Sequence, residues 1–217
     1  MSLNKMQIHF SSVTELAQIG TSKWSYDQPL FVIPFTNSTM LRQSADLMAQ
    51  RAEAPGHILA IFDDLNWGFI RIVNAVFRLS HSPLFGYVAQ DAFAGRAWLR
   101  FAMDALGSEH HFLGFNDGKW AGGIASFGLA RRSWANSNYG GDFFCPQYHR
   151  HYADAELTLL ALQQGVYVYD ANSVLIEIDW EKDRKEVDEK DRKIFLERRG
   201  HGFDGKVSNS NLLNMIK

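Results

Sequence analysis

The densest group of side chains that could do chemistry lies between Tyr148 and Glu156. Two tyrosines, two histidines, an arginine, an aspartate and a glutamate fall within these nine residues. Apolar residues recur at helical spacing directly afterwards, and Gly165 is placed to end that helix. Asp154 and Glu156 therefore fall in the first turn, where the helix dipole favours negative charge. Such a cluster can hold a reactive group in a fixed place, or it can simply cap a surface helix.

Two further interpretations of the same cluster stay open. His149 and His151 have the H-x-H spacing of a metal-binding pair, which makes a metal hydrolase an alternative function. As cations, these residues could equally meet a phosphate group. Arg150 between them is the stronger candidate for that role, because its guanidinium group is always charged.

The elements that would position this cluster begin with alternating strands and helices. Three apolar runs, at residues 30–35, 57–62 and 85–89, predict strands that are buried on both faces. Helical spacing separates them, so we expect right-handed crossovers and a parallel sheet with helices on both faces. Ligands gather at the carboxyl ends of the strands in such sheets, and two of these three strand ends carry aspartates.

Further patterning predicts helices at 13–19, 37–51, 67–79, 95–106 and 131–135, and strands at 111–115, 124–130, 166–169 and 173–178. Residues 179–199 mix charges of both signs at helical spacing, which predicts a solvated helix. Residues 200–217 contain several glycines, asparagines and serines. They predict a tail that is mobile or that folds down only with a ligand.

Length and composition limit the class of protein. The chain has 217 residues, of which 46% are apolar, enough for the core of one domain. The net charge of −2 gives no general attraction to nucleic acid or to an anionic membrane. The single Cys145 excludes an internal disulfide and a cysteine-rich zinc site. No apolar run approaches the roughly 20 residues of a membrane span, and the N-terminus lacks the regions of a signal peptide, so we expect a cytoplasmic protein.

Four motifs then occur in a fairly specific order. They are an apolar strand ending in a polar loop (Val32–Asn37), paired aspartates after a strand (Asp63–Asp64), a strand end with one aspartate (Tyr87–Asp91), and a glycine-rich set followed by an acidic helix start (122–127, 140–144 and 153–157). This order resembles the family 2 glycosyltransferases, the inverting nucleotide-sugar enzymes with the GT-A fold. The resemblance covers roughly residues 28–180.

The resemblance implies a donor site at the strand ends. The residues that it places near the nucleotide-diphospho-sugar are Thr36, Asp63, Asp64, Gln90, Asp91, Gly122 and Gly123. One aspartate of the pair at 63–64 would bond the base or the ribose, and the two glycines would let the backbone approach the donor or acceptor closely. A uridine diphosphate sugar is the favoured donor.

The resemblance also implies a catalytic aspartate. Asp154 matches the general base that takes the proton of the acceptor hydroxyl. On the acceptor side we expect Asp117, Trp120, Arg150 and Glu156, with the aromatic face of tryptophan suited to a sugar ring. Because residues two apart differ by about 200° around a helix, Asp154 and Glu156 share a cleft only if the helix start is irregular. The acceptor would be a carbohydrate or another hydroxyl compound.

The expected cation site departs from the family pattern. Only Asp91 remains as a clear carboxylate in the metal motif, and Glu177 stands where family members often have a histidine ligand. Asp91 and Glu177 are therefore the expected ligands of a divalent cation, magnesium or manganese. The reduced motif leaves a second alternative open, a nucleotide-sugar-binding protein of the same fold that has lost catalysis.

The expected architecture is α/β, a GT-A-like three-layer sandwich with a mostly parallel mixed sheet and a charged C-terminal helix. We expect one nucleotide-sugar-binding domain over residues 1–180. Residues 181–217 would add the charged helix and a mobile tail packed on the same domain.

Overall fold

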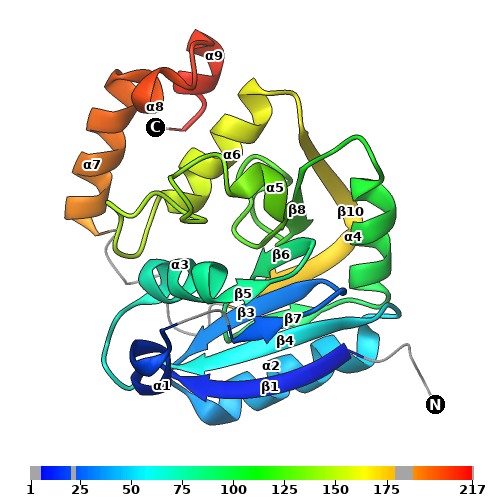
Figure 1. Ribbon diagram of the computed structural model, residues 1–217. Coiled ribbons are helices and arrows are strands. Elements are labelled where there is room, and N and C mark those ends of the chain that lie inside the picture. Colours follow the sequence, from blue (N-terminus) through cyan, green and yellow to red (C-terminus); the bar gives the residue numbers. More distant parts are fainter. Residues whose placement is uncertain (1–5, 21–22, 179–187, 217) are drawn as a thin grey trace.

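The computed structural model describes residues 6–20, 23–178 and 188–216. Its centre is an eight-stranded sheet with the order β1-β4-β3-β6-β9-β8-β10-β7 (Figure 1). Parallel pairing joins β1, β4, β3 and β6, and also β8 and β10, whereas β9 and β7 run antiparallel to their neighbours. The strands of this sheet are β1 (Met6–Ser12), β3 (Leu30–Phe35), β4 (Gly56–Phe62), β6 (Leu84–Tyr87), β7 (Ala92–Ala94), β8 (Phe112–Asn116), β9 (Gly128–Arg131) and β10 (Tyr167–Glu177).

Helices cover both faces of this sheet and make three layers. One core cluster joins the sheet to α3, α6 and α7, and the other joins it to α2 and α4 on the opposite face. The helices are α1 (Val13–Gln18), α2 (Ser38–Arg51), α3 (Phe69–Leu79), α4 (Trp98–Leu106), α5 (Arg132–Ala135), α6 (Ala153–Gln163), α7 (Glu189–Gly200), α8 (Gly202–Gly205) and α9 (Ser210–Leu213). A two-stranded sheet is formed by β2 (Trp24–Ser25) and β5 (Ser80–His81). The predicted α/β sandwich with a mostly parallel mixed sheet is confirmed.

The apolar runs form the strands that the sequence predicts. Every residue of β3 is buried, and β4 is buried except at its ends, because both strands lie inside the sheet with helices on each face. The missed strand is β1, which pairs only with β4 at the sheet edge and is half exposed. Its sequence therefore lacks the continuous apolar run that identified β3 and β4.

The second half of the sheet differs from prediction in two places. The strand expected at 124–130 is limited to β9, and Ile124 and Phe127 line a cavity instead. The two strands expected at 166–169 and 173–178 are one strand, β10, whose register against β8 shifts between Tyr169 and Val174.

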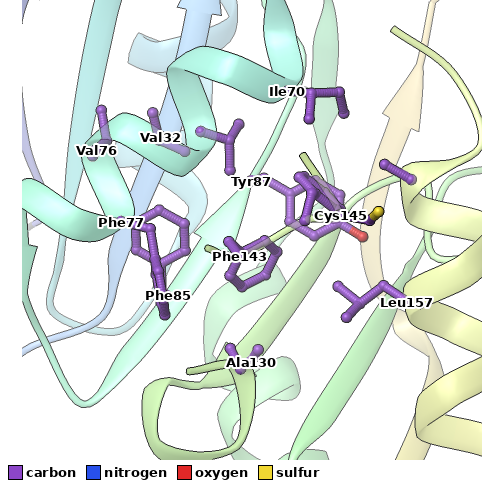
Figure 2. Close-up of a cluster of buried hydrophobic side chains, with 14 of the residues drawn as sticks. Val32, Ile70, Val76, Phe77, Phe85, Tyr87, Ala130, Phe143, Cys145 and Leu157 are labelled. Carbon is purple, nitrogen blue, oxygen red and sulfur yellow. The ribbon is translucent and has the colours of Figure 1, made fainter. Parts of the chain in front are cut away.

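An aromatic cluster fixes the segment that leads into α6. Phe143 packs against Phe77, Phe85 and Tyr87, with ring centroids 5.1–5.5 Å apart (Figure 2). The backbone N–H and carbonyl of Phe144 both bond the side chain of Asn74 on α3, at 2.8 and 3.0 Å. The segment before α6 is therefore anchored from the core side by ring packing and by the amide of Asn74.

The mixed charges of the C-terminal helix predicted that it is solvated, but one of its faces is buried. The first part of the predicted helix, 179–187, lies outside the described residues, and α7 covers the rest. Asp191, Phe195 and Arg198 are buried, and their spacing places them on one face of α7.

The tail beyond α7 contains α8 and α9, where the sequence predicted a mobile segment. Phe203 and Val207 are buried in the core cluster that includes α6. The side-chain oxygen of Gln163 on α6 accepts the N–H groups of Ser208 and Asn209 at 3.1 and 3.0 Å. Anchors of this kind are single residues, and they give no periodic signal in the sequence. Across the described parts of the chain, no helix combines the length and apolarity that crossing a membrane requires.

Candidate functional site

A cavity of about 850 Å³ opens where the carboxyl ends of β3, β4 and β6 meet the starts of α3 and α6. The following predicted site residues line it: Thr36, Asp63, Gln90, Trp120, Arg150, Asp154 and Glu177. The remaining predicted site residues do not: Asp64, Asp91, Asp117, Gly122, Gly123 and Glu156. Residues 118 positions apart in the sequence, Thr36 and Asp154, thus share one cavity.

The sheet edge of the cavity is held by hydrogen bonds between side chains and backbone. The Asp63 carboxylate accepts the N–H groups of Trp67 and Gly68 at 2.7 and 2.9 Å, which fixes the turn into α3. Gln90 Oε1 accepts the N–H groups of Thr36 and Asn37, both at 2.9 Å. Because the amide oxygen is used in this way, the NH₂ group of Gln90 remains as its donor.

Asp64 points away from the cavity, which corrects its prediction as a donor contact. Its Oδ1 accepts the Thr14 N–H of α1 at 3.0 Å. Hydrogen bonding to Thr14 lowers the pKa of this carboxyl group. Of the pair after β4, only Asp63 lines the cavity, because the chain turns at Asp64 and directs that side chain to α1.

Of the two expected cation ligands, Glu177 ends β10 and Asp91 lies in the turn directly before β7, the strand that pairs with β10. Glu177 pairs with Ala92 in the β7–β10 ladder, and Asp91 is the residue directly before Ala92. Asp91 is only 8% exposed and does not line the cavity. Glu177 does line it, with Oε2 3.4 Å from Lys119 Nζ.

The donor set of this edge does not fit a protein-held cation. Within residues 6–20, 23–178 and 188–216, no group of three histidine, cysteine, aspartate or glutamate side chains could hold a metal ion. The residue beside the motif aspartate is an amide whose oxygen is already bonded to two N–H groups. The described side chains therefore form no all-protein cage. A magnesium or manganese ion here would depend on one or two carboxylates together with donor phosphates and waters, so Asp91 and Glu177 as its ligands stay a prediction.

The loop after β8 carries Trp120 to the cavity wall. Asp117 is almost fully buried, and its Oδ1 accepts the N–H groups of Lys119 and Trp120, both at 2.9 Å. Asp117 therefore shapes the loop and does not line the cavity, so the structure lends no support to its predicted contact with an acceptor. The side chain of Trp120 is 51% exposed beside the cavity, where a flat ligand can stack on it.

The two glycines of this loop act on packing and do not line the cavity, and their approach to a donor stays a prediction. Gly122 has φ +82°, and a Cβ there would lie 2.6 Å from the ring of Tyr169 on β10. Its carbonyl accepts the Tyr167 hydroxyl at 3.0 Å. A Cβ at Gly123 would lie 3.1 Å from the carbonyl oxygen of Trp120. The loop therefore needs glycine in order to lie against β10 and to turn back on itself.

Asp154 lies at the start of α6 on the far wall of the cavity. Tyr152 before the helix adopts φ +68°, and Asp154 Oδ1 accepts the N–H of Ala155 at 2.9 Å. Burial, together with the nearby charges of Glu177 and Asp117, raises the pKa of Asp154 to about 6, although backbone N–H groups oppose the shift. A carboxylate with this pKa is suited to accept a proton near neutral pH.

Glu156 was predicted on the acceptor side, but in the structure it forms a buried ion pair with Arg198. Arg198 Nε and Nη2 each lie 2.8 Å from one of its oxygens, and the hydroxyls of Tyr139 and Tyr148 donate at 3.0 and 2.8 Å. Glu156 is fully buried. The separation of about 200° on a helix explains why it faces α7 while Asp154 faces the cavity.

A single carboxylate on α7 holds the segment before Asp154. The buried Asp191 accepts the N–H groups of His149, Arg150 and His151 at 2.9, 2.7 and 2.8 Å. Four residues further along α7, Phe195 stacks on Tyr152 with ring centroids 4.8 Å apart. One face of α7 thus fixes the backbone from His149 to Glu156. The sequence did not identify it, because Asp191 lies in a run of mixed charges.

The histidines of the H-x-H pair do not share one site. His151 lines the cavity, whereas His149 packs beside Gly68 and does not line it. The described residues provide no third ligand for such a pair. The metal hydrolase alternative therefore gains no support.

Several cavity-lining residues were not predicted: Asn66, Phe69, Ser126, Tyr152 and Ile216 are examples. Asn66 occupies a turn with φ +52°, a conformation that asparagine tolerates, and this turn after two aspartates was the available signal. Ile216 reaches the cavity because Arg199 Nη1 bonds its carbonyl at 2.6 Å. Nothing in the local sequence indicates that contact.

Comparison with known proteins gives matches only at the level of structure, since no protein-family model and no curated protein sequence matches the chain. TarS residues 1–349 of S. aureus aligns over 87% of this chain and 69% of its own length, with TM-score 0.62 and 9% identity. The mannosyltransferase PcManGT of Pyrobaculum calidifontis, solved with GDP-Man and Mn²⁺, aligns over 93% of this chain and 73% of its own length, with TM-score 0.60 and 9% identity. Glucosyl-3-phosphoglycerate synthase of Mycobacterium tuberculosis, solved with Mn²⁺, UDP-glucose and phosphoglyceric acid, aligns over 95% of this chain and 89% of its own length, with TM-score 0.52 and 9% identity.

These likenesses show the fold. The chain has the GT-A fold of nucleotide-sugar transferases, as the order of its motifs predicted. The chain spans 42% of a longer TarS structure, so that protein contains much that is not represented here. At 9% identity the comparison does not transfer any residue's role, and the site must be argued from its own geometry.

Proposed function

We propose that this protein is a glycosyltransferase that transfers a sugar, with inversion, from a nucleotide-diphospho-sugar to an acceptor hydroxyl. The observation that carries the proposal is one cavity with Asp63 and Gln90 on the sheet edge and Asp154 on the opposite wall. In a sheet of this kind, ligands bind beyond the carboxyl ends of the strands. The solved neighbours include complexes with UDP-glucose and GDP-Man, so a nucleoside diphosphate sugar is the donor class.

The donor belongs on the sheet edge. The NH₂ group of Gln90 and the polar residue Thr36 after β3 provide donors and acceptors for a nucleotide. Asp63 faces the same space and is fixed by two backbone bonds, so it can accept from a base or a ribose hydroxyl without reorganising. A uridine nucleotide is the favoured donor.

Asp154 acts as general base in this proposal. The acceptor oxygen attacks the anomeric carbon as its proton passes to the Asp154 carboxylate, and the bond to the diphosphate breaks with its electron pair leaving on the diphosphate oxygen. Attack from the face opposite the leaving group inverts the anomeric centre. The raised pKa of Asp154, about 6, makes its conjugate acid stable enough to hold that proton.

The acceptor belongs beside Trp120 and Tyr152, which line the cavity on the side of Asp154. Their rings suit the apolar face of a carbohydrate, although another hydroxyl compound would meet the same base. The solved complexes of the two neighbours contain a divalent cation. If this protein binds one, Glu177 is the predicted ligand that lines the cavity.

The test is a panel of UDP- and GDP-sugars incubated with the full chain and followed by release of the free nucleoside diphosphate. Release with at least one donor, and a product of inverted anomeric configuration by NMR, is the expected result. Donor binding without release of the nucleoside diphosphate, in the presence of a range of hydroxyl acceptors, would favour the alternative of an inactive nucleotide-sugar-binding protein. The reduced metal motif motivates that alternative. Absence of binding by any donor would contradict both.

A further inference from the structure

Gln90 stands beside the motif aspartate on the sheet edge of the cavity, and it is an amide. Its Oε1 accepts the N–H groups of Thr36 and Asn37. A carboxamide whose oxygen is occupied in this way offers only its NH₂ group to a ligand, and an NH₂ group does not coordinate metals. A diphosphate beside Gln90 would therefore meet a hydrogen-bond donor where a second metal-binding carboxylate could have stood.

The wall opposite the sheet edge carries a positively charged side chain, Arg150. Arg150 lines the cavity, and within the described ranges no carboxylate forms an ion pair with its guanidinium group. His151 lines it as well, and its Nδ1 accepts the Asp188 N–H at 3.3 Å. The neutral imidazole therefore carries its proton on Nε2, so that His151 can donate to an anion in either protonation state.

The backbone that carries these two side chains is fixed. Asp191 takes up the N–H groups of residues 149–151, so none of the three is left to bind a ligand or to shift freely. A cation on a fixed backbone loses less conformational freedom on binding than one on a mobile loop. The arrangement has the properties of a preorganised anion site.

We propose that Arg150 and His151 bind the diphosphate of the donor and stabilise it as the leaving group, in place of a protein-held divalent cation. This inference rests on the proposed function. As the anomeric C–O bond breaks, its electron pair passes to the terminal diphosphate oxygen, and that added charge is met by the guanidinium group of Arg150 and by Nε2–H of His151. The proton of the acceptor still goes to Asp154, so both charges are balanced within the cavity.

The test is calorimetric titration of the full chain with UDP and with GDP after treatment with EDTA, repeated with added Mn²⁺. The expected result is binding of one nucleotide without metal, with an affinity that Mn²⁺ changes by less than about threefold. Arg150→Ala should weaken that binding by about tenfold or more, Arg150→Lys by less, and His151→Ala by a smaller factor, because a charge-assisted bond to phosphate is lost. Arg42→Ala, which removes an exposed arginine of α2 outside the cavity, is the matched control and should bind as the parent protein does.

Circular dichroism and thermal unfolding of each variant check that it folds. Binding that appears only with Mn²⁺ would overturn this inference and leave the proposed function standing. Unchanged nucleotide affinity in Arg150→Ala, with a raised KM for the acceptor, would also overturn it and move Arg150 to the acceptor side. No binding of either nucleotide, with or without Mn²⁺, would overturn the inference and the proposed function together.

Discussion

The two walls of the cavity are built in different ways. The sheet wall is held by bonds among the strand ends and the turns that follow them, from Asp63 to Trp67 and Gly68 and from Gln90 to Thr36 and Asn37. The α6 wall is held from α7, a separate helix, through the bonds of Asp191 and of Arg198. One wall therefore follows from the sheet itself, whereas the other depends on a helix that packs on it.

The largest expected effect on stability comes from the α6 wall. Arg198→Ala would leave Glu156 buried without its cation and should lower the free energy of unfolding by about 3–5 kcal/mol. The matched control is Arg100→Ala, whose ion pair with Glu53 is exposed and whose loss should cost less than about 1 kcal/mol. Urea denaturation measures both, and equal losses would contradict a special role for α7.

A smaller and more local effect is expected from Asp191→Asn. An amide offers one acceptor oxygen where the carboxylate offers two, so at least one buried N–H among residues 149–151 loses its partner, at a cost of about 1–3 kcal/mol. Hydrogen exchange followed by mass spectrometry should show faster exchange in peptides that cover these residues. Exchange that rises equally in α2, on the other face of the sheet, would point to a general loss of stability.

The sheet wall offers a paired test at adjacent residues. Asp63→Asn should weaken nucleotide binding by about tenfold, because Asp63 faces the cavity, and an amide accepts less well than a carboxylate. Asp64→Asn should leave binding unchanged, because its carboxylate bonds the Thr14 N–H of α1 and does not line the cavity. The reverse ranking in a nucleotide titration would contradict the orientation of this pair.

The smallest expected effect is a pH dependence. Because the pKa of Asp154 is raised to about 6, the base is protonated and inactive below that pH and ionised above it. The ratio kcat/KM should therefore rise with pH through about 6 and then level off, with a tenfold loss for each pH unit below the pKa. A profile that is flat between pH 5 and 8, in roughly the range where this carboxyl titrates, would argue against Asp154 as the base.

What the sequence predicts well lies where local pattern and final environment agree. The apolar runs of β3 and β4 predict buried strands, and the sheet that they form places Thr36, Asp63 and Gln90 at one edge. The position of Asp154 at the start of α6 was also accessible, because the acidic first turn is a local feature.

The rest depends on partners that no local pattern reveals. Glu156 and Asp154 look alike in the sequence, and only Arg198 decides that Glu156 is buried in an ion pair. Asp117 resembles a binding carboxylate but bonds two N–H groups of its own loop. Asp191 is one charge among many until the fold brings residues 149–151 against it.

Donor binding and turnover should separate in Asp154→Asn. This variant should bind the donor with an affinity within about threefold of the parent protein, since Asp154 acts on the acceptor. Turnover should fall by about 100-fold or more, the usual contribution of a positioned general base. Full turnover in this variant, with the fold intact, would contradict the assignment of the two walls to donor and base.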